Sequence, residues 1–440
     1  MITRILRSLR PVAGLALLAV LAAGGLGCAD DDTSPVDPGG VIDDPGDDPG
    51  DDPGDDPGDD PGDNPGDDPG DDPGDDPADD PPVADLALFL SDPTPTLRDA
   101  VLADYGFELV RVFGQGRTIL VNGTADPDDL VDDERVLAFQ SDGPTEFSSP
   151  VELTMSFFEG DFEEGLPTQD AFASWRLDEV HARARGEGVK VAVLDTGVDP
   201  THPLLASRVR TIEEGEWGLG SIDVAANVDT DGDGLFDEAH GHGTHVAGIV
   251  ASVAPDAEIL SVRVLDSDGV GTAFDLARGL YRAAEWGADI INLSLILSNQ
   301  SAVIEEIVDE LEDDILIVGA AGNRPGPAGY PAREDDVLAV AALGWDLTPA
   351  DFTATGDVDL GAPGVEVLSA FPGGAWAAAT GTSMAAGSTS GALAVVAGLL
   401  DEADDADDFL LNTARRDVPG GIPSIALLDA VLEALGEIDD

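Results

Sequence analysis

The hydrophobic positions divide the chain into segments of different character. Residues 11–26 are almost all apolar, residues 41–80 repeat Pro-Gly-Asp-Asp, and apolar runs recur from residue 86 to the carboxyl end. The run 189–194 is nearly continuous and rich in valine, which is typical of a parallel strand buried on both faces. The stretch 384–400 consists of small and apolar residues and predicts a tightly packed, buried helix.

Residues 83–158 predict a small α+β unit. Strand-like and helix-like runs follow one another in the order β-α-β-β-α-β, with strands at 86–90, 108–113, 117–121 and 136–140 and helices at 97–105 and 127–135. This order is the ferredoxin-like split pattern. An unrelated α+β spacer would have the same elements, so the role of the unit stays open at this point.

The amino terminus predicts an export signal at residues 1–28. Three arginines precede the apolar stretch 11–26, which is too short to span a bilayer comfortably. The stretch ends at Cys28, the single cysteine of the chain, so an internal disulfide is excluded. This ending resembles a bacterial lipoprotein box, which implies a lipid on Cys28 that holds the protein to the membrane. Ala29 follows rather than aspartate, which by analogy implies the outer membrane or cell surface. An ordinary secretory signal is the alternative.

Charge defines the next segment and excludes one class of function. Residues 29–82 are dense in aspartate, proline and glycine and contain no basic residue, so they predict an extended, disordered tether. The whole chain has a net charge of -70, which argues against a nucleic-acid binder. Lys190 is the only lysine. A high-salt habitat and a GC-rich genome explain that scarcity equally well.

Candidate chemistry begins at the end of the predicted strand 189–194. Asp195 follows directly, and open parallel sheets place their sites at the carboxyl ends of strands. A carboxylate there can hold one nitrogen of an imidazole and select its tautomer. A strand-end aspartate that caps a turn is the simpler alternative when Asp195 is considered by itself.

A histidine and a serine complete the candidate triad. His242 begins the run Gly-Thr-His-Val-Ala-Gly, and this register favours His242 over His240 and His245. Ser383 stands at the start of the predicted helix 384–400, where free N–H groups and the helix dipole favour an oxyanion. The order Asp, His, Ser is one of the known orders of a catalytic triad.

Beyond the triad, Val-Gly-Ala-Ala-Gly-Asn323, Tyr330-Pro-Ala and Gly361-Ala-Pro-Gly complete a resemblance to the subtilase family over residues 165–436. The resemblance implies a serine endopeptidase acting on proteins or peptides, with a three-layer α/β/α parallel-sheet domain at 159–440. It implies that Asn323 donates to the oxyanion. It also implies substrate contacts at Gly269 and Gly271, in the segment that pairs with the substrate backbone, and at Ser294 and Leu295, which wall the primary specificity pocket. We expect a monomer.

The sequence departs from the family pattern at two places, in the segment that walls the specificity pocket and in the helix after Ser383. Ile296 stands where the family usually has glycine after Ser-Leu, which changes the expected shape of the specificity pocket. Gly387 and Ser388 stand where Pro-His is usual, which predicts a looser helix start.

Residues 83–158 resemble the family's inhibitory prodomain in position and element order. This implies self-cleavage between residues 147 and 169, with release of the soluble enzyme.

An acidic run just before His242 predicts a structural calcium site. It reads Asp-Thr-Asp-Gly-Asp-Gly-Leu-Phe-Asp, and its acids are Asp229, Asp231, Asp233 and Asp237. Acids at alternate positions followed by a glycine turn resemble the start of a calcium loop. An acidic surface turn is the alternative.

Two other functions are alternatives. A subtilase fold that has lost turnover and serves as a surface binding module is the main alternative, which the departures at Ile296 and Gly387 favour weakly. A serine hydrolase of another type would require a Gly-x-Ser-x-Gly elbow, and Ser383 lies in Thr-Ser-Met instead.

Overall fold

The computed structural model describes residues 86–141, 147–148, 156–158, 163–212 and 219–437. The predicted export signal, Cys28 and the acidic tether lie outside these residues. Within the described part of the chain, none of the helices combines the length and the apolar character that crossing a bilayer requires.

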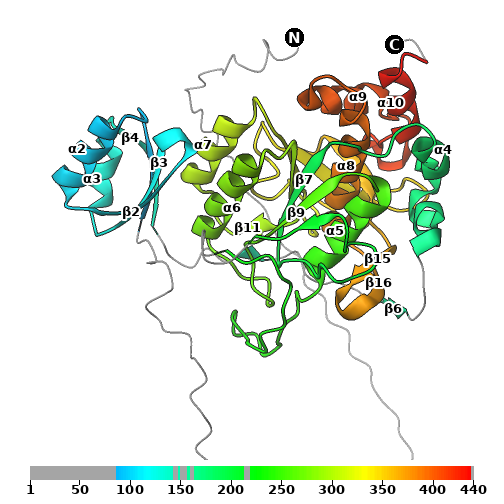
Figure 1. The fold of residues 1–440 in the computed structure, drawn as a ribbon, viewed down its shortest axis with the longest axis horizontal. Coiled ribbons are helices and arrows are strands. Elements are labelled where there is room, and N and C mark those ends of the chain that lie inside the picture. The colour runs from blue at the N-terminus through cyan, green and yellow to red at the C-terminus, as the bar shows by residue number, and fades with distance from the viewer. Residues whose placement is uncertain (1–85, 142–146, 149–155, 159–162, 213–218, 438–440) are drawn as a thin grey trace, which may run out of the picture. The chain divides into compact units, whose positions relative to one another are not determined.

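The described residues from 163 to 437 form the larger of two structural units, and a seven-stranded parallel sheet lies at its centre (Figure 1). Its order is β14-β13-β12-β10-β7-β9-β8. The strands are β7 (Lys190–Asp195), β8 (Val209–Arg210), β9 (Glu258–Arg263), β10 (Ile290–Leu293), β12 (Leu316–Ala320), β13 (Leu338–Leu343) and β14 (Leu360–Pro363). The predicted strand 189–194 is thus β7, and it lies inside the sheet between β10 and β9.

Helices cover both faces of this sheet. Helices α5 (His242–Val253) and α8 (Thr382–Ala397) share a core with Val191 and Val193, whereas α6 (Ala273–Trp286) and α7 (Ala302–Leu311) share a second core with Ala192 and Leu194. Successive side chains of a strand point to opposite faces, so β7 separates two helical layers. This arrangement confirms the predicted three-layer α/β/α fold. Three further helices are α4 (Leu177–His181), α9 (Ala406–Thr413) and α10 (Leu427–Ala434).

Local signals mark the ends of the surface helices. Thr272 and Asp275 form a reciprocal capping box at the start of α6, and Gly287 ends the helix with φ +74°. The hydroxyl oxygen of Ser301 accepts from the backbone N–H of Ile304 at the start of α7. These caps satisfy backbone groups that the helix itself leaves without partners.

Close packing of α5 and α8 explains the departure at Gly387. A Cβ atom on Gly387 would lie 3.2 Å from Cγ1 of Val246, and one on Gly391 would lie 2.7 Å from Cβ of Val253. The hydroxyl of Ser388 donates to the carbonyl of Pro363 at 3.0 Å. Helix α8 runs unbroken through both positions.

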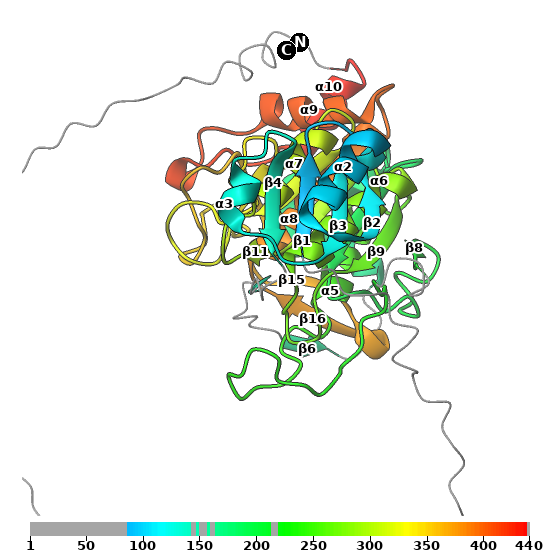
Figure 2. The ribbon, with the colours of Figure 1, turned by 90° about the vertical axis from the view of Figure 1, so that its left-hand side faces the viewer.

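The smaller unit is a four-stranded antiparallel sheet in the order β2-β3-β1-β4. Its elements are β1 (Leu86–Leu90), α2 (Pro95–Tyr105), β2 (Glu108–Phe113), β3 (Thr118–Asn122), α3 (Pro127–Val131) and β4 (Val136–Ser141), in the predicted order. Figure 2 shows α2 and α3 in front of this sheet. Helix α3 is shorter than predicted, because the chain turns after it and Arg135 pairs with Asp133.

Strand β1 is buried on both of its faces. Its leucines Leu86, Leu88 and Leu90 pack with α2 and α3, whereas Ala87 and Phe89 belong to the core that contains α6 and α7. A strand covered on both sides is apolar at every position, which explains the run Leu-Ala-Leu-Phe-Leu.

Two short strands from the segment after β4 join the larger unit. Strand β5 (Phe147–Ser148) pairs antiparallel with β11 (Ile296–Leu297). Strand β6 (Ser156–Phe158) pairs antiparallel with β16 (Ala375–Ala379), which also forms a hairpin with β15 (Val367–Phe371).

Candidate active site

Asp195 lies at the carboxyl end of β7 and is buried, with 1% of its surface exposed. Its Oδ1 accepts a hydrogen bond from the backbone N–H of Thr196 at 2.7 Å and lies 2.7 Å from Nδ1 of His242. Its other oxygen, Oδ2, is buried and has no hydrogen-bond partner among the described residues. The carboxylate therefore holds the imidazole by one oxygen that the backbone also fixes.

Glycine allows His242 to approach this carboxylate. A Cβ atom on Gly243 would lie 2.2 Å from the carbonyl oxygen of Gly197 and 3.0 Å from Cβ of Asp195. The backbone N–H of Gly243 donates to Oγ1 of Thr196 at 3.0 Å. The first turn of α5 thus abuts the loop that leaves β7, and only glycine fits at the contact.

The environment of His242 sets its protonation. Burial disfavours the charged imidazolium, but the negative charge and the hydrogen bond of Asp195 outweigh burial and raise the pKa of His242 above its ordinary value. Because Nδ1 faces the carboxylate, the neutral ring carries its proton there and presents Nε2 as the base. This is the protonation pattern that a general base needs.

The two neighbouring histidines have structural partners. His245 is buried, Nε2 lies 2.9 Å from the carbonyl of Ala377, and burial lowers its pKa to about 4. Nδ1 of His240 lies 2.9 Å from Asp223, whose carboxylate raises the pKa of His240. Both contacts support the choice of His242 as the candidate base.

Ser383 is the second residue of α8 and is buried at the site. Its hydroxyl donates to the carbonyl of Ser294 at 3.4 Å, and its own carbonyl accepts from the hydroxyl of Ser294 at 3.1 Å. Gly387 of α8 lies against Val246 of α5, and Gly391 lies against Val253, so the two helices run in the same direction. Their first turns, which carry Ser383 and His242, therefore lie at the same end. From the sequence, only the family resemblance assigns Ser294 to the site.

Asn323 is fastened to the residue before the candidate nucleophile. Its amide oxygen accepts from the backbone N–H of Thr382 at 2.9 Å and from Oγ1 of Thr382 at 3.0 Å. Oγ1 of Thr382 in turn accepts from the N–H of Gly322 at 3.1 Å. These bonds fix the orientation of the Asn323 side chain, whose amide nitrogen is a hydrogen-bond donor. Sequence reasoning missed Thr382, although its place directly before Ser383 is a signal.

The remaining predicted substrate contacts lie on two segments. Ser294 and Leu295 connect β10 to β11, and Leu295 is fully buried. Gly269 lies in a turn with φ +81°, held by the carboxylate of Asp266, which accepts from the N–H of Val270 at 2.9 Å. Gly271 follows this turn and precedes α6.

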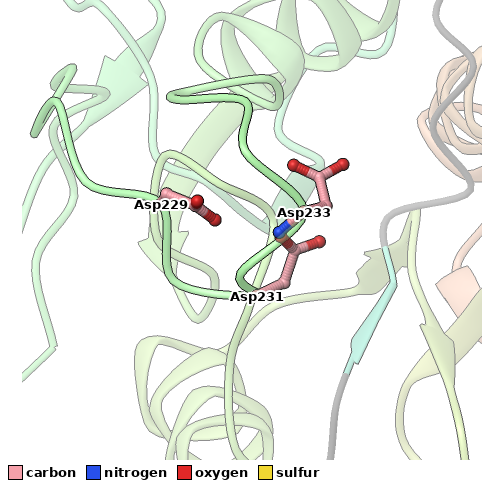
Figure 3. A group of neighbouring side chains, drawn as sticks. All are labelled: Asp229, Asp231 and Asp233. Atoms are coloured by element: carbon pink, nitrogen blue, oxygen red, sulfur yellow. The ribbon is translucent and has the colours of Figure 1, made fainter.

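The predicted acidic loop brings three of its four aspartates together. Asp229, Asp231 and Asp233 come from one loop and lie close enough to share an ion (Figure 3). Asp237 does not join them, because its carboxylate accepts from the N–H groups of Ala226 and Asn227 at 2.8–2.9 Å. In this structure Asp237 closes the base of the loop and stands apart from the group of three.

Two residues that sequence analysis did not assign to the metal site complete a second acidic group. Oxygens of Asp231, Glu238 and Asp268 lie within 4.8 Å of one another. Asp268 is buried, its Oδ2 accepts from the N–H of Thr230, and its Oδ1 has no hydrogen-bond partner among the described residues. Burial and the neighbouring carboxylates raise the pKa of Glu238. A buried, unpartnered carboxylate oxygen beside two other acids fits a hard cation with oxygen ligands, such as calcium.

The fold and this arrangement together define a serine-type endopeptidase of the subtilisin class. Residues 186–425 match the model of the subtilase family of peptidases. An intracellular serine protease of Paenibacillus polymyxa is 35% identical over 260 residues, which cover 54% of this chain and 77% of the relative. Subtilisin Savinase of Lederbergia lenta is 38% identical over 240 residues, covering 50% and 83%. An alkaline protease of Alkalihalobacillus alcalophilus is 36% identical over 260 residues, covering 55% and 63%. The chain belongs to the subtilase family.

Proposed function

We propose that the protein hydrolyses peptide bonds through Ser383, His242 and Asp195, with Asn323 as an oxyanion donor. The observation that carries this assignment is the 2.7 Å contact between buried Asp195 and His242, at the end of the sheet where Thr382 ties Asn323 to the helix that carries Ser383. The hydroxyl of Ser383 attacks the substrate carbonyl, and Nε2 of His242 takes the proton and later passes it to the leaving amine.

Electrostatic preorganisation supplies the rest of the catalysis. Asp195 stabilises the imidazolium that forms on His242. The amide nitrogen of Asn323 and the backbone N–H of Ser383 donate to the tetrahedral oxyanion. Loss of one such side-chain donor in a subtilisin costs about 10²- to 10³-fold in kcat, and we expect the same order for Asn323→Ala.

A fluorophosphonate probe tests this function without knowledge of the substrate. The wild type should be labelled and should hydrolyse casein, whereas Ser383→Ala should do neither. Ser390→Ala is the matched control, because Ser390 lies on the same helix and its hydroxyl donates to Asn292. An unlabelled, well-folded wild type would favour the alternative of a binding module on this fold.

We further propose that calcium binds the acidic loop. Asp229, Asp231 and Asp233 would hold the ion from the loop, and Glu238 and Asp268 would hold it from the opposite side. Calcium would supply charge neutralisation to acids that otherwise repel one another. Its role there is structural, since it would fix the loop that precedes α5 to the turn that contains Gly269.

We propose that residues 83–158 inhibit the enzyme before maturation. The hydroxyl of Tyr281 on α6 lies 2.6 Å from Oγ1 of Thr118, and its ring stacks on Phe113 at 5.5 Å. Strand β5 occupies the edge of β11, which begins two residues after Ser294. Strand β6 pairs with β16, which ends four residues before Ser383. These contacts support cleavage between Ser148 and Ser156.

The lipid anchor and tether would then remain with the inhibitory unit. Cys28 and residues 29–82 precede the proposed cleavage, so the membrane would hold the inhibited zymogen at the outer membrane or cell surface. Maturation would release a soluble, monomeric protease that acts on protein or peptide substrates.

A further inference from the structure

A peptide-binding edge next to Ser383 is visible in the chain itself. Strand β11 is held along one edge by Tyr330, whose carbonyl accepts from the N–H of Leu297 at 2.7 Å. Its other edge pairs antiparallel with β5, with Ile296 opposite Ser148. The chain thus places an extended peptide on this edge, and main-chain pairing of this kind does not depend on sequence.

Two segments border the place of the attacked residue. Ser294, directly before β11, contacts Ser383 through both its hydroxyl and its carbonyl. On the other side, Gly322 and Asn323 are fastened to Thr382. A peptide on β11 that delivers its carbonyl to Ser383 and Asn323 therefore directs the side chain of the attacked residue between these two segments.

The side chain of Ile296 occupies the space between them. A Cβ atom on Gly329 would lie 2.6 Å from Cδ1 and 2.9 Å from Cγ2 of Ile296, and one on Gly322 would lie 3.7 Å from Cδ1. Ile296 therefore reaches across from β11 and packs on the bare backbone of Gly329 and beside Gly322. A β-branched side chain at this position is stiff, so it does not swing aside easily.

We propose that Ile296 restricts the protease to substrates whose attacked residue is small, such as glycine, alanine or serine. This inference rests on the proposed function of Ser383 and Asn323. A large aromatic side chain at that substrate position would have to share the volume that Ile296 already fills, and well-packed sites tolerate no such overlap. Ile296 acts by excluding volume and has no part in the proton transfers.

A pair of peptide substrates tests the proposal. Protein produced from the full chain and matured is assayed with Ala-Ala-Pro-Ala and Ala-Ala-Pro-Phe p-nitroanilides, and active enzyme is counted with the fluorophosphonate probe. We expect the wild type to prefer alanine to phenylalanine by at least about tenfold in kcat/KM, a ratio that pocket size can produce. Ile296→Gly should lower this ratio by about 100-fold, and Ile296→Ala by less.

Two controls make the outcome decisive. Ile296→Leu conserves the side-chain volume and should keep the preference of the wild type. The ratio of the two substrates is independent of the fraction of enzyme that folds, so a less stable glycine variant still gives an answer. A labelled wild type that prefers phenylalanine, or an Ile296→Gly enzyme with an unchanged ratio, overturns the inference and leaves the peptidase function intact. A folded wild type that is neither labelled nor active on either peptide overturns both.

Discussion

Gly243 meets the carbonyl of Gly197 with no room for a methyl group, since a Cβ atom on Gly243 would lie 2.2 Å from that oxygen. This contact sets how closely the first turn of α5 approaches β7, and it therefore sets the distance between His242 and Asp195. Even alanine, which adds only a methyl group, would therefore push His242 away from Asp195 if it replaced Gly243.

The first prediction follows from this contact. Gly243→Ala should lower kcat/KM by about 100-fold or more, because displacements near 1 Å at a catalytic group have that effect. It should also lower Tm through overpacking. Gly165→Ala is the control for a glycine substitution outside the site, because Gly165 is exposed, has no positive φ and a Cβ atom there meets nothing within 4 Å. Full activity of Gly243→Ala would show that α5 can shift without cost.

The second prediction concerns the pH dependence of the reaction. Catalysis needs neutral His242, and Asp195 raises the pKa of His242, so kcat/KM should rise with pH through a value above 6.5. Asp195→Asn removes the charge that opposes the effect of burial, so the rise should move to lower pH. The rate should also fall by about 10⁴-fold. Asp346→Asn, in an exposed turn, is the control and should leave the profile unchanged. A wild-type profile that rises at or below pH 6.5 would contradict the assignment.

The third prediction tests the calcium site through stability. Calcium that binds only the folded state should raise the free energy of unfolding, by about 2.7 kcal/mol at a hundredfold excess over Kd. Melting curves with calcium and with a chelator should differ for the wild type and should coincide for Asp231→Asn and Asp268→Asn. Asp237→Asn is the matched control, since Asp237 closes the loop without joining the acidic group. It should lower Tm and keep the response to calcium. A wild type without any response would make the loop a plain acidic turn.

The fourth prediction concerns three acids near the end of α7. Burial, together with a hydrogen bond and the charge of Asp336, raises the pKa of Glu312 to about 7 and that of Asp309 to about 6. Between pH 4.5 and 7 the folded state therefore binds more protons than the unfolded state, and the stability from this cluster falls as pH rises. Asp336→Asn should raise Tm by about 2 °C at pH 8 and less at pH 5. Asp335→Asn, exposed and adjacent, should not. A lower Tm for Asp336→Asn at pH 8 would contradict the prediction.

The fifth prediction concerns maturation. Wild type and Ser383→Ala are expressed from Met1, membranes are separated from medium, and fragments are identified by amino-terminal sequencing. The wild-type catalytic unit should appear in the medium with a new terminus between Ser148 and Ser156, whereas the variant should stay intact on the membrane. Cys28→Ser should release the uncleaved chain if Cys28 is the anchor. A full-length, membrane-bound and fully active wild type would show that residues 83–158 are a permanent spacer.

Sequence by itself determined the elements and their order. The valine-rich run before Asp195 and the run of small residues after Ser383 carry their own local pattern, so the strand at 189–194 and the helix at 384–400 were predicted within about three residues of the observed bounds, Lys190–Asp195 and Thr382–Ala397. The four strands of the smaller unit were predicted for the same reason. Composition also set the extreme negative charge. These properties depend on neighbours along the chain, and the sequence contains them directly.

Only the tertiary structure decided which side chains meet. The backbone N–H of Thr382 donates to Asn323, 59 residues away in sequence. Asp268 accepts from the N–H of Asp231 in the acidic loop, 37 residues away. Asp237 instead accepts from the backbone of its own loop at Ala226. The sequence shows the departure at Ile296 but not its consequence. Gly329, on which the Ile296 side chain packs, lies 33 residues further along the chain and meets that side chain only in the fold. Local pattern specifies helices and strands, whereas contacts across the sheet depend on how whole elements pack, and packing is a property of the complete chain.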